Sequence, residues 1–185
     1  RRVPFIYASS ASTYGHGKNG FTEKPECEEA LNPYAYSKLF FDRYLRRFEK
    51  DLQSQVVGLR YFNVFGPNEN HKGNMASLVR QMFYKLRETG EITLFEGTDG
   101  YGDGEQVRDF IYVKDVVNVN FFFWEHPEIS GIFNCGTGEA KSFNRFMKAV
   151  IDYNGSGNLR YIPFPEVLKG KYQSFTEADT TKLMA

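Results

Sequence analysis

Short apolar runs alternate along this chain with longer segments of helical periodicity, and this alternation constrains the fold more than any other feature. The apolar runs, bounded by turn residues, are Val3–Ala8, Val56–Phe62, Ile92–Phe95, Phe110–Val113, Ile132–Cys135 and Leu159–Ile162. The periodic segments predict helices over 34–50, 75–88, 115–125 and 142–153. Strands that alternate with helices of about ten or more residues are typical of right-handed βαβ units. The sequence therefore predicts an α/β fold with a mainly parallel sheet.

Residues that start and end helices flank these segments. Asn32 offers a side-chain cap followed by a proline at the first helical position, and Ser142 offers a cap of the same kind. We expect Asp115 to cap the third helix and Gly90 to end the second. Within the third helix, Phe121–Trp124 is expected to pack in the core, because it falls in an amphipathic segment.

Composition excludes several classes of protein. Of 185 residues, 23 are Lys or Arg and 23 are Asp or Glu, so no net charge attracts nucleic acid or an anionic membrane. The longest apolar run, Val119–Trp124, is too short to cross a bilayer. Three histidines and two cysteines supply neither a disulfide framework nor a zinc cluster. We therefore expect no metal, no nucleic-acid partner, no membrane, and the reduced thiols of a cytoplasmic protein.

Tyr34 and Lys38 form the central pair of candidate catalytic residues. They lie four positions apart in Tyr-Ala-Tyr-Ser-Lys, at the first turns of the first predicted helix, so both side chains project from one face. A phenol with a pKa near ~10 is a poor base at neutral pH. A neighbouring ammonium favours the phenolate and lowers that pKa. A solvated surface pair has the same spacing, so the spacing alone leaves both readings open.

Polar segments follow the first two predicted strands. Ser9-Ser10 and Ser12 come after the first strand, and Arg60–Pro67 covers the end of the second and the turn after it. In parallel α/β sheets ligands collect outside the carboxyl ends of the strands, so these segments and Tyr34 should converge on one crevice. A serine hydroxyl there could bond a reacting oxygen. Ser10 is the first candidate, with Ser9 and Ser12 behind it.

Together these segments resemble a known family. The serine-rich strand end, the Tyr34/Lys38 pair and Arg60–Pro67 (Arg-Tyr-Phe-Asn-Val-Phe-Gly-Pro) occur in the order and spacing of extended short-chain dehydrogenases/reductases that act on nucleotide sugars. A narrower resemblance, to the ADP-glyceromanno-heptose 6-epimerases, is carried by His71–Ser77, Leu94–Gly97, Arg108–Phe110, Tyr161–Pro165 and Lys169–Thr176.

The resemblance implies NADP-dependent epimerisation of ADP-D-glycero-D-manno-heptose at C6″, which makes a precursor of the lipopolysaccharide core. Tyr34 would take the hydroxyl proton as hydride leaves for NADP, and Ser10 would polarise the reacting oxygen. Lys72 would be the second acid/base, because two faces of a ketone need two proton donors and one rigid Tyr cannot reach both. From its position alone, Lys72 is better explained as a solvated loop cation than as a catalytic residue. The residues that would contact NADP are Tyr34, Lys38, Val64 and Lys72.

The resemblance also implies a set of substrate-binding residues. These are Ser10, Asn63, Asn74, Gln81, Phe95, Glu96, Gly97, Thr98, Arg108 and Tyr172. Arg108 would bind the diphosphate, because its planar fork pairs with two oxygens, although a surface salt bridge is the alternative. Tyr172 would close over the diphosphate from a basic loop. Asn74 stands where the family often has Ser, and Gln81 where some members have His, but both can still hydrogen-bond.

The implied fold is a Rossmann-like doubly wound parallel sheet with a smaller α/β substrate-binding lobe. Residues 1–66 would belong to the C-terminal part of the dinucleotide-binding domain, 67–110 and 140–185 mainly to the lobe, and 111–139 to the sheet again. The sequence shows no counterpart of the family's glycine-rich phosphate loop, so we expect this chain to lack the N-terminal βαβαβ half. The family resemblance also implies a homo-oligomer.

Two other functions remain open from the sequence. One is a nucleotide-sugar 4-epimerase or dehydratase of the same fold. A dehydratase would need an acidic residue beside the serine to abstract a carbon-bound proton, and Ala11-Ser12-Thr13 offers none. The other is a non-catalytic protein that binds a nucleotide sugar.

Overall fold

A three-stranded parallel sheet forms the centre of the first part of the structure. In the computed structural model, which describes residues 3–185, this sheet contains β1 (Phe5–Ser10), β2 (Val56–Tyr61) and β6 (Gly131–Cys135), in the order β1-β2-β6. Both pairings are parallel, and Ser10, the last residue of β1, lies opposite the last residue of β2. The carboxyl ends of β1 and β2 therefore meet at one edge.

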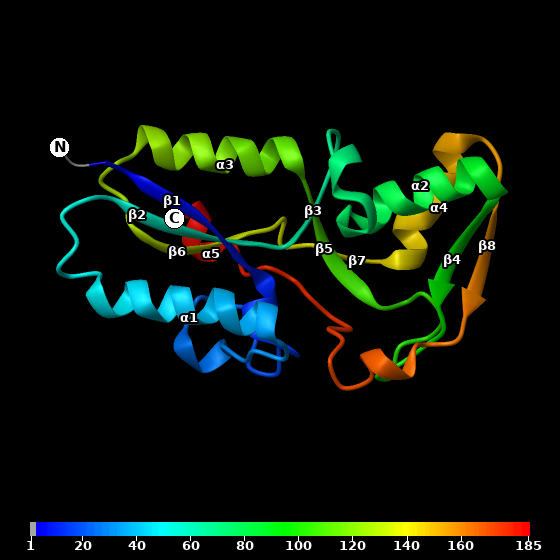
Figure 1. The fold of residues 1–185 in the computed structure, drawn as a ribbon, viewed down its shortest axis with the longest axis horizontal. Helices are drawn as coiled ribbons and strands as arrows, with labels where there is room; N and C mark the ends of the chain where they lie inside the picture. The colour runs from blue at the N-terminus through cyan, green and yellow to red at the C-terminus, as the bar shows by residue number, and fades with distance from the viewer. Residues whose placement is uncertain (1–2) are drawn as a thin grey trace.

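Helices cover both faces of this sheet. Helix α1 (Pro33–Phe48) lies on one side and α3 (Val113–Glu125) on the other (Figure 1). Val57, Leu59 and Phe133 from the strands pack with Phe123 of α3, and burial of each such side chain contributes about 1.5–3 kcal/mol. The doubly wound, Rossmann-like α/β class predicted from the sequence is confirmed.

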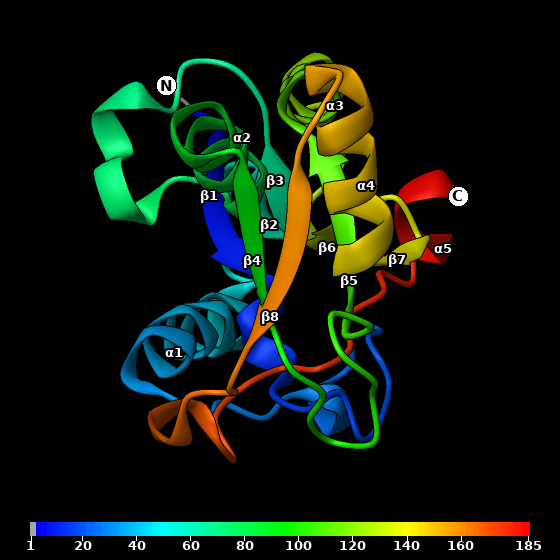
Figure 2. The ribbon, with the colours of Figure 1, turned by 90° about the vertical axis from the view of Figure 1, so that its right-hand side faces the viewer.

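A second lobe lies beyond the carboxyl ends of the strands. β4 (Glu91–Phe95) pairs in parallel with β8 (Asn158–Ile162), and α2 (Leu78–Thr89) and α4 (Phe143–Asn154) lie beside this pair (Figure 2). The lobe has its own buried cluster, made by Leu86, Ile92, Leu94, Phe110, Phe143 and Met147.

A small mixed sheet joins the two bodies. β5 (Val107–Tyr112) lies between β3 (Asn63–Phe65), to which it is parallel, and β7 (Ala140–Ser142), to which it is antiparallel. Phe110 packs in the cluster of the second lobe, whereas the next residue, Ile111, packs against the first sheet. β5 therefore couples both cores. The shorter helical elements are η1 (Ala11–Tyr14), η2 (Pro25–Cys27), η3 (Asn70–Met75), η4 (Glu166–Leu168) and α5 (Thr181–Met184).

Three of the predicted helix-end residues act as expected. The Asn32 side chain accepts a hydrogen bond from the Ala35 N–H, and the Ser142 side chain accepts one from Arg145. Gly90 ends α2 in the left-handed conformation, with φ of 73°, which favours glycine.

The predicted starts of two helices are wrong. α2 begins at Leu78 and not at Met75, because the Ser77 side chain caps it and Gly73 breaks the preceding 3-10 segment with φ of 51°. α3 begins at Val113, so Asp115 lies in its first turn and is not the cap.

Two further predictions about α3 and β5 need correction. Of Phe121–Trp124 only Phe123 is buried, at 1% exposure, while Phe121 is 60% and Trp124 65% exposed. A helix with 3.6 residues per turn points only one of these four directly at the sheet. β5 begins at Val107, before the predicted Phe110, because its early residues pair with β7. None of the helices within residues 3–185 is long and apolar enough to cross a membrane.

Candidate active site

Tyr34 and Lys38 lie where α1 begins, beside β1. The Lys38 ammonium donates a hydrogen bond of 2.9 Å to the carbonyl oxygen of Ala8 and lies 5.8 Å from the centre of the Tyr34 ring. Tyr34 is 57% exposed, so its phenol is open to a bound molecule. The two side chains share one face of α1 as predicted.

Ser10 lies at the carboxyl end of β1, with its side chain bonded to Ser12. Its oxygen accepts hydrogen bonds from the Ser12 N–H, at 3.2 Å, and from the Ser12 hydroxyl, at 2.9 Å. Both bonds use Ser10 as acceptor, which leaves its hydroxyl proton for an oxygen of a bound molecule. Ser9, in contrast, is buried and donates to Asp42 at 2.9 Å, so its proton is already used.

A buried ionic network lies behind these residues. Arg60 of β2 is fully buried and bonds Asp42 of α1 at 2.9 Å and Glu28 at 2.5 Å. Burial opposes ionisation of Glu28, but hydrogen bonds from Arg46 and Arg60 outweigh it and hold the pKa of this carboxyl below its usual range. The network ties α1 to the sheet.

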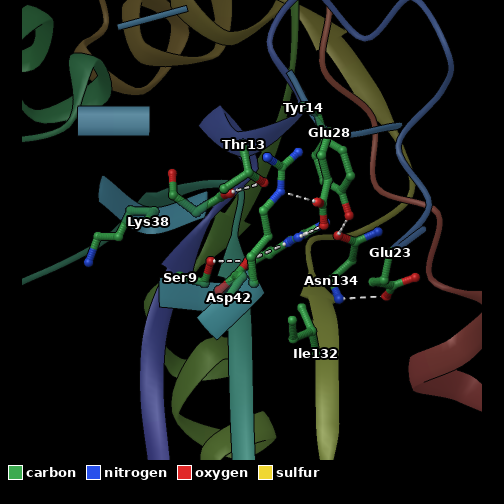
Figure 3. A network of polar contacts seen from close by, with 12 residues as sticks. Ser9, Thr13, Tyr14, Glu23, Glu28, Lys38, Asp42, Ile132 and Asn134 are labelled. Carbon is green, nitrogen blue, oxygen red and sulfur yellow. Dashed lines mark hydrogen bonds and ion pairs between the residues drawn. The ribbon is translucent and has the colours of Figure 1, made fainter. Parts of the chain in front are cut away.

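Figure 3 shows how the network is arranged. Asp42 and Ser9 lie together, while Tyr14, Glu28 and Asn134 are grouped beyond them. The Tyr14 hydroxyl donates to Asn134 at 2.6 Å, and its ring lies 4.8 Å from the Arg60 guanidinium. Burial raises the pKa of Tyr14 above its ordinary value, so its hydroxyl stays protonated and acts as a structural donor.

A pocket of about 480 Å³ brings together six of the predicted ligand-binding residues. These are Asn63, Val64, Gln81, Phe95, Arg108 and Tyr172. Leu94 and Phe143 add apolar surface to its wall. Asn63 lies two residues beyond Tyr61, the last residue of β2, so the pocket lies next to the carboxyl end of β2. Tyr34, Lys38 and Ser10 are not among the residues that line it.

Arg108 is the buried cation of this pocket. It is 6% exposed, and its guanidinium lies 4.8 Å from the Tyr172 ring and 5.4 Å from the Phe143 ring. One N–H bonds the carbonyl of Val107 at 2.9 Å, and within residues 3–185 Arg108 forms no ion pair with a carboxylate. Burial lowers the pKa of Arg108, and the Tyr172 phenol opposes that change. The surface salt bridge considered as an alternative is excluded.

The segment at Tyr172 links this pocket to the serine loop. Burial raises the pKa of the Tyr172 phenol, against the effect of Arg108. The next residue, Gln173, donates from its side-chain amide to the carbonyl of Gly15 at 2.5 Å and to that of Ala11 at 3.4 Å. The two ends of the site are therefore connected by two adjacent side chains.

Lys72 and Asn74 lie apart from this pocket, on the exposed segment η3. The Lys72 ammonium is 3.8 Å from the Glu69 carboxylate. Glu69 also accepts hydrogen bonds of 2.7 Å from both the N–H and the hydroxyl of Ser77, and one of 3.3 Å from the Gly66 N–H. Burial opposes ionisation of Glu69, but these bonds hold its pKa below the usual range. Within the described residues, no hydrogen bond or ion pair joins Lys72 to Tyr34 or Ser10.

Glu96, Gly97 and Thr98 begin the loop after β4, next to the pocket residue Phe95. The Gly97 N–H donates to the Asp103 side chain at 2.8 Å. A Cβ at Gly97 would lie 2.2 Å from the carbonyl oxygen of Tyr101, so only glycine fits this close approach. These residues lie at the rim and do not line the pocket.

Two residues of the site were missed by sequence reasoning. Asp42 falls on the buried stripe of α1 with Ala35 and Leu39, and a carboxylate at such a position indicates a buried polar partner. That pattern could have identified it. Gln173 carries no comparable sequence pattern, because its partners lie far away in the chain.

Comparison with known proteins agrees with this geometry. Residues 1–136 match the NAD dependent epimerase/dehydratase family. The chain belongs to this family. The chain is 60% identical over 185 residues to the ADP-L-glycero-D-manno-heptose-6-epimerase of Alkalilimnicola ehrlichii. The match covers all of this chain and 58% of that protein. The family resemblance inferred from the motifs is confirmed.

Solved structures of other family members show the same fold. The ADP-L-glycero-D-manno-heptose-6-epimerase of Helicobacter pylori is 33% identical, with a TM-score of 0.80 over 97% of this chain and 51% of that one. A UDP-N-acetylglucosamine 4-epimerase from Methanobrevibacter ruminantium is 27% identical, with a TM-score of 0.82 over 97% of this chain and 55% of that one. The chain thus spans between half and three fifths of the relatives it matches.

Proposed function

We propose that this chain belongs to an enzyme that converts ADP-D-glycero-D-manno-heptose to ADP-L-glycero-D-manno-heptose at C6″ with NADP. The identity of 60% across the whole chain to a protein of that name carries the substrate assignment. The exposed phenol of Tyr34, with the Lys38 ammonium 5.8 Å from the centre of its ring, supports the chemistry.

The residues at the end of β1 suit a nicotinamide dinucleotide. Lys38 uses one N–H on the Ala8 carbonyl, and an ammonium has two more donors for ribose hydroxyls. Val64 offers apolar surface at the adjoining pocket. We assign Tyr34, Lys38, Val64 and Lys72 to this cofactor, which supplies a reversible hydride acceptor when it is bound.

The protein's own groups handle the protons. Tyr34 accepts the proton of the C6″ hydroxyl, and Ser10 donates a hydrogen bond to the same oxygen as it becomes a carbonyl. When the ketone presents its other face, Lys72 supplies the proton that the reformed hydroxyl requires. Each carbon–oxygen centre therefore begins and ends as a secondary alcohol, and no net redox change occurs.

The pocket holds the rest of the substrate. Arg108, buried and without a carboxylate partner within residues 3–185, provides the charge and the fork that a diphosphate needs, and Tyr172 covers it. Asn63 and Gln81 offer amides to the sugar and its linkage. We place Asn74 on the sugar side as well, and the nucleotide against the segment Phe95, Glu96, Gly97 and Thr98.

We also propose a setting for the reaction. Both thiols, Cys27 and Cys135, are free and buried, which suits a reducing compartment such as the cytoplasm. The product would enter synthesis of the lipopolysaccharide core. The enzyme would work as a homo-oligomer, as the resemblance implies.

The test compares two tyrosines of α1 that are similarly exposed, 57% for Tyr34 and 60% for Tyr36, but of which only Tyr34 is assigned a role. In the complete, cofactor-loaded enzyme, Tyr34→Phe should abolish conversion of the two C6″ epimers, followed by proton NMR, while ADP binding stays within about threefold. Tyr36→Phe is the matched control, because Tyr36 lies on the same helix and is 60% exposed. Full turnover by Tyr34→Phe would show that the base is misassigned. Turnover of UDP-glucose in place of the ADP-heptose would show that the substrate is misassigned.

A further inference from the structure

We propose that Asp42 is a positioning residue that fixes Tyr34 and Lys38 relative to Ser10. The inference rests on the proposed function, since it concerns the alignment of the groups assigned to that reaction. Asp42 touches neither substrate nor cofactor, and its effect runs through the placement of α1.

Three consecutive residues of β1 are tied to α1. The Tyr7 hydroxyl donates to one Asp42 oxygen at 2.9 Å, and the Ser9 hydroxyl donates to the other at 2.9 Å. Between them, the Ala8 carbonyl accepts the Lys38 ammonium at 2.9 Å. Figure 3 shows Ser9 beside Asp42 and Lys38 extending away from that group. The next residue of the strand is Ser10.

These hydrogen bonds fix the position of α1 along β1, which apolar packing alone does not determine. Apart from Asp42, the buried residues of α1 are Ala35 and Leu39, whose contacts are non-directional and tolerate a small slide along the strand. Because the Asp42 carboxylate accepts hydrogen bonds from two residues that are two apart on β1, these bonds set both the axial position and the rotation of the helix. Tyr34 lies eight residues from Asp42 on the same helix, about 12 Å along its axis. A shift of the helix at Asp42 therefore moves the Tyr34 phenol as well.

Arg60 holds the Asp42 carboxylate in its orientation through an ion pair. Its Nε donates to the same Asp42 oxygen as Ser9, at 2.9 Å, and both side chains are fully buried. Arg60 also pairs with Glu28, whose other partners are Arg43 and Arg46. Glu28 is therefore the control: a buried carboxylate on the same arginine, which contacts α1 only through Arg43 and Arg46 in its C-terminal half and has no bond to β1 within residues 3–185.

The experiment compares Asp42→Asn with Glu28→Gln in the complete, cofactor-loaded enzyme. Asn keeps the shape of Asp, but its NH₂ group faces donors, so the ties to β1 weaken. We expect kcat to fall at least tenfold in Asp42→Asn with KM within about threefold, because small misplacements of reacting groups cost that much or more. In Glu28→Gln, kcat should stay within about threefold at a comparable loss of melting temperature.

A double variant guards against a failure to fold. Tyr7→Phe with Ser9→Ala removes the two partners on β1 and leaves the Asp42–Arg60 pair intact. It should reproduce the kcat loss of Asp42→Asn.

A second readout needs no substrate. With 3-fluorotyrosine at position 34, the ¹⁹F resonance should shift or split in Asp42→Asn and in the double variant, and stay in place in Glu28→Gln. Equal effects of Asp42→Asn and Glu28→Gln on kcat and on the resonance would overturn the positioning role. Should the unaltered enzyme fail to epimerise ADP-heptose while the resonance still moves selectively, the positioning role stands and the proposed function falls.

Discussion

Arg108 provides the sharpest test of how the pocket holds its ligand. The guanidinium is buried between Phe143 and Tyr172, and one of its N–H groups is bonded to the Val107 carbonyl. Arg108 lines the pocket, and within residues 3–185 no carboxylate forms an ion pair with it. We expect a diphosphate to accept hydrogen bonds from two of its remaining N–H groups at once.

The size of the effect follows from these donors. A hydrogen bond to a charged group contributes about 1.5–3 kcal/mol, so Arg108→Gln should lose about 3 kcal/mol or more when two such bonds disappear. Since each 1.4 kcal/mol is a factor of ten, ADP should bind about 100-fold more weakly. Arg108→Lys keeps the charge but not the fork, and we expect a loss of about tenfold.

Isothermal titration of ADP into the cofactor-loaded enzyme measures these constants. Arg160→Gln is the control, because Arg160 lies in the same lobe but is exposed and paired with Glu91 at 2.9 Å. It should leave ADP affinity within about twofold. Binding of ADP by Arg108→Gln within threefold of the unaltered protein would refute a phosphate role for Arg108.

Three further predictions concern the groups around the site. Arg60→Met should lower the free energy of unfolding in urea by about 3–5 kcal/mol, because it leaves two buried carboxylates without their partner. Arg43→Ala removes a half-exposed partner of Glu28 and should lower it by less than about 1 kcal/mol. Equal losses in the two variants would contradict this prediction. Burial, aided by nearby carboxylates, raises the pKa of the Cys135 thiol to about 12, so about one thiol in ten thousand is ionised at pH 8. Since the thiolate is the reactive form, iodoacetamide should label Cys135 only after the protein is unfolded. The pKa of Glu69 is lowered, so its stabilising effect is complete above an unfolded pKa of about 4.3 and is lost as pH falls through the lower folded value. The stability gap between the unaltered protein and Glu69→Gln should therefore narrow in acid, and a constant gap down to pH 2 would argue against it.

The start of α1 could be predicted because its causes are local. Asn32 caps the helix, a proline occupies the next position, and the spacing of Tyr34 and Lys38 then places both on one face. The meeting of Ser10 with the Arg60–Pro67 segment also follows from the general rule for parallel strands.

Non-local pairing accounts for what the sequence did not reveal. β3 and β7 are each only a few residues long and exist because β5 lies between them, so neither forms a recognisable period of its own. The cluster of Glu28, Asp42 and Arg60 joins three separate segments, since Asp42 lies 18 and Glu28 32 residues before Arg60. No local sequence pattern predicts which of these charged residues form ion pairs with one another.

The central claim is that C6″ is oxidised and reduced again at one site, with Tyr34 moving the hydroxyl proton. Epimerisation run to equilibrium in D₂O and followed by mass spectrometry and proton NMR tests it most directly. The account predicts that the carbon-bound hydrogen at C6″ leaves and returns without reaching water, so the product carries no deuterium on that carbon and no NADPH is consumed. Deuterium at C6″ in step with turnover would contradict it.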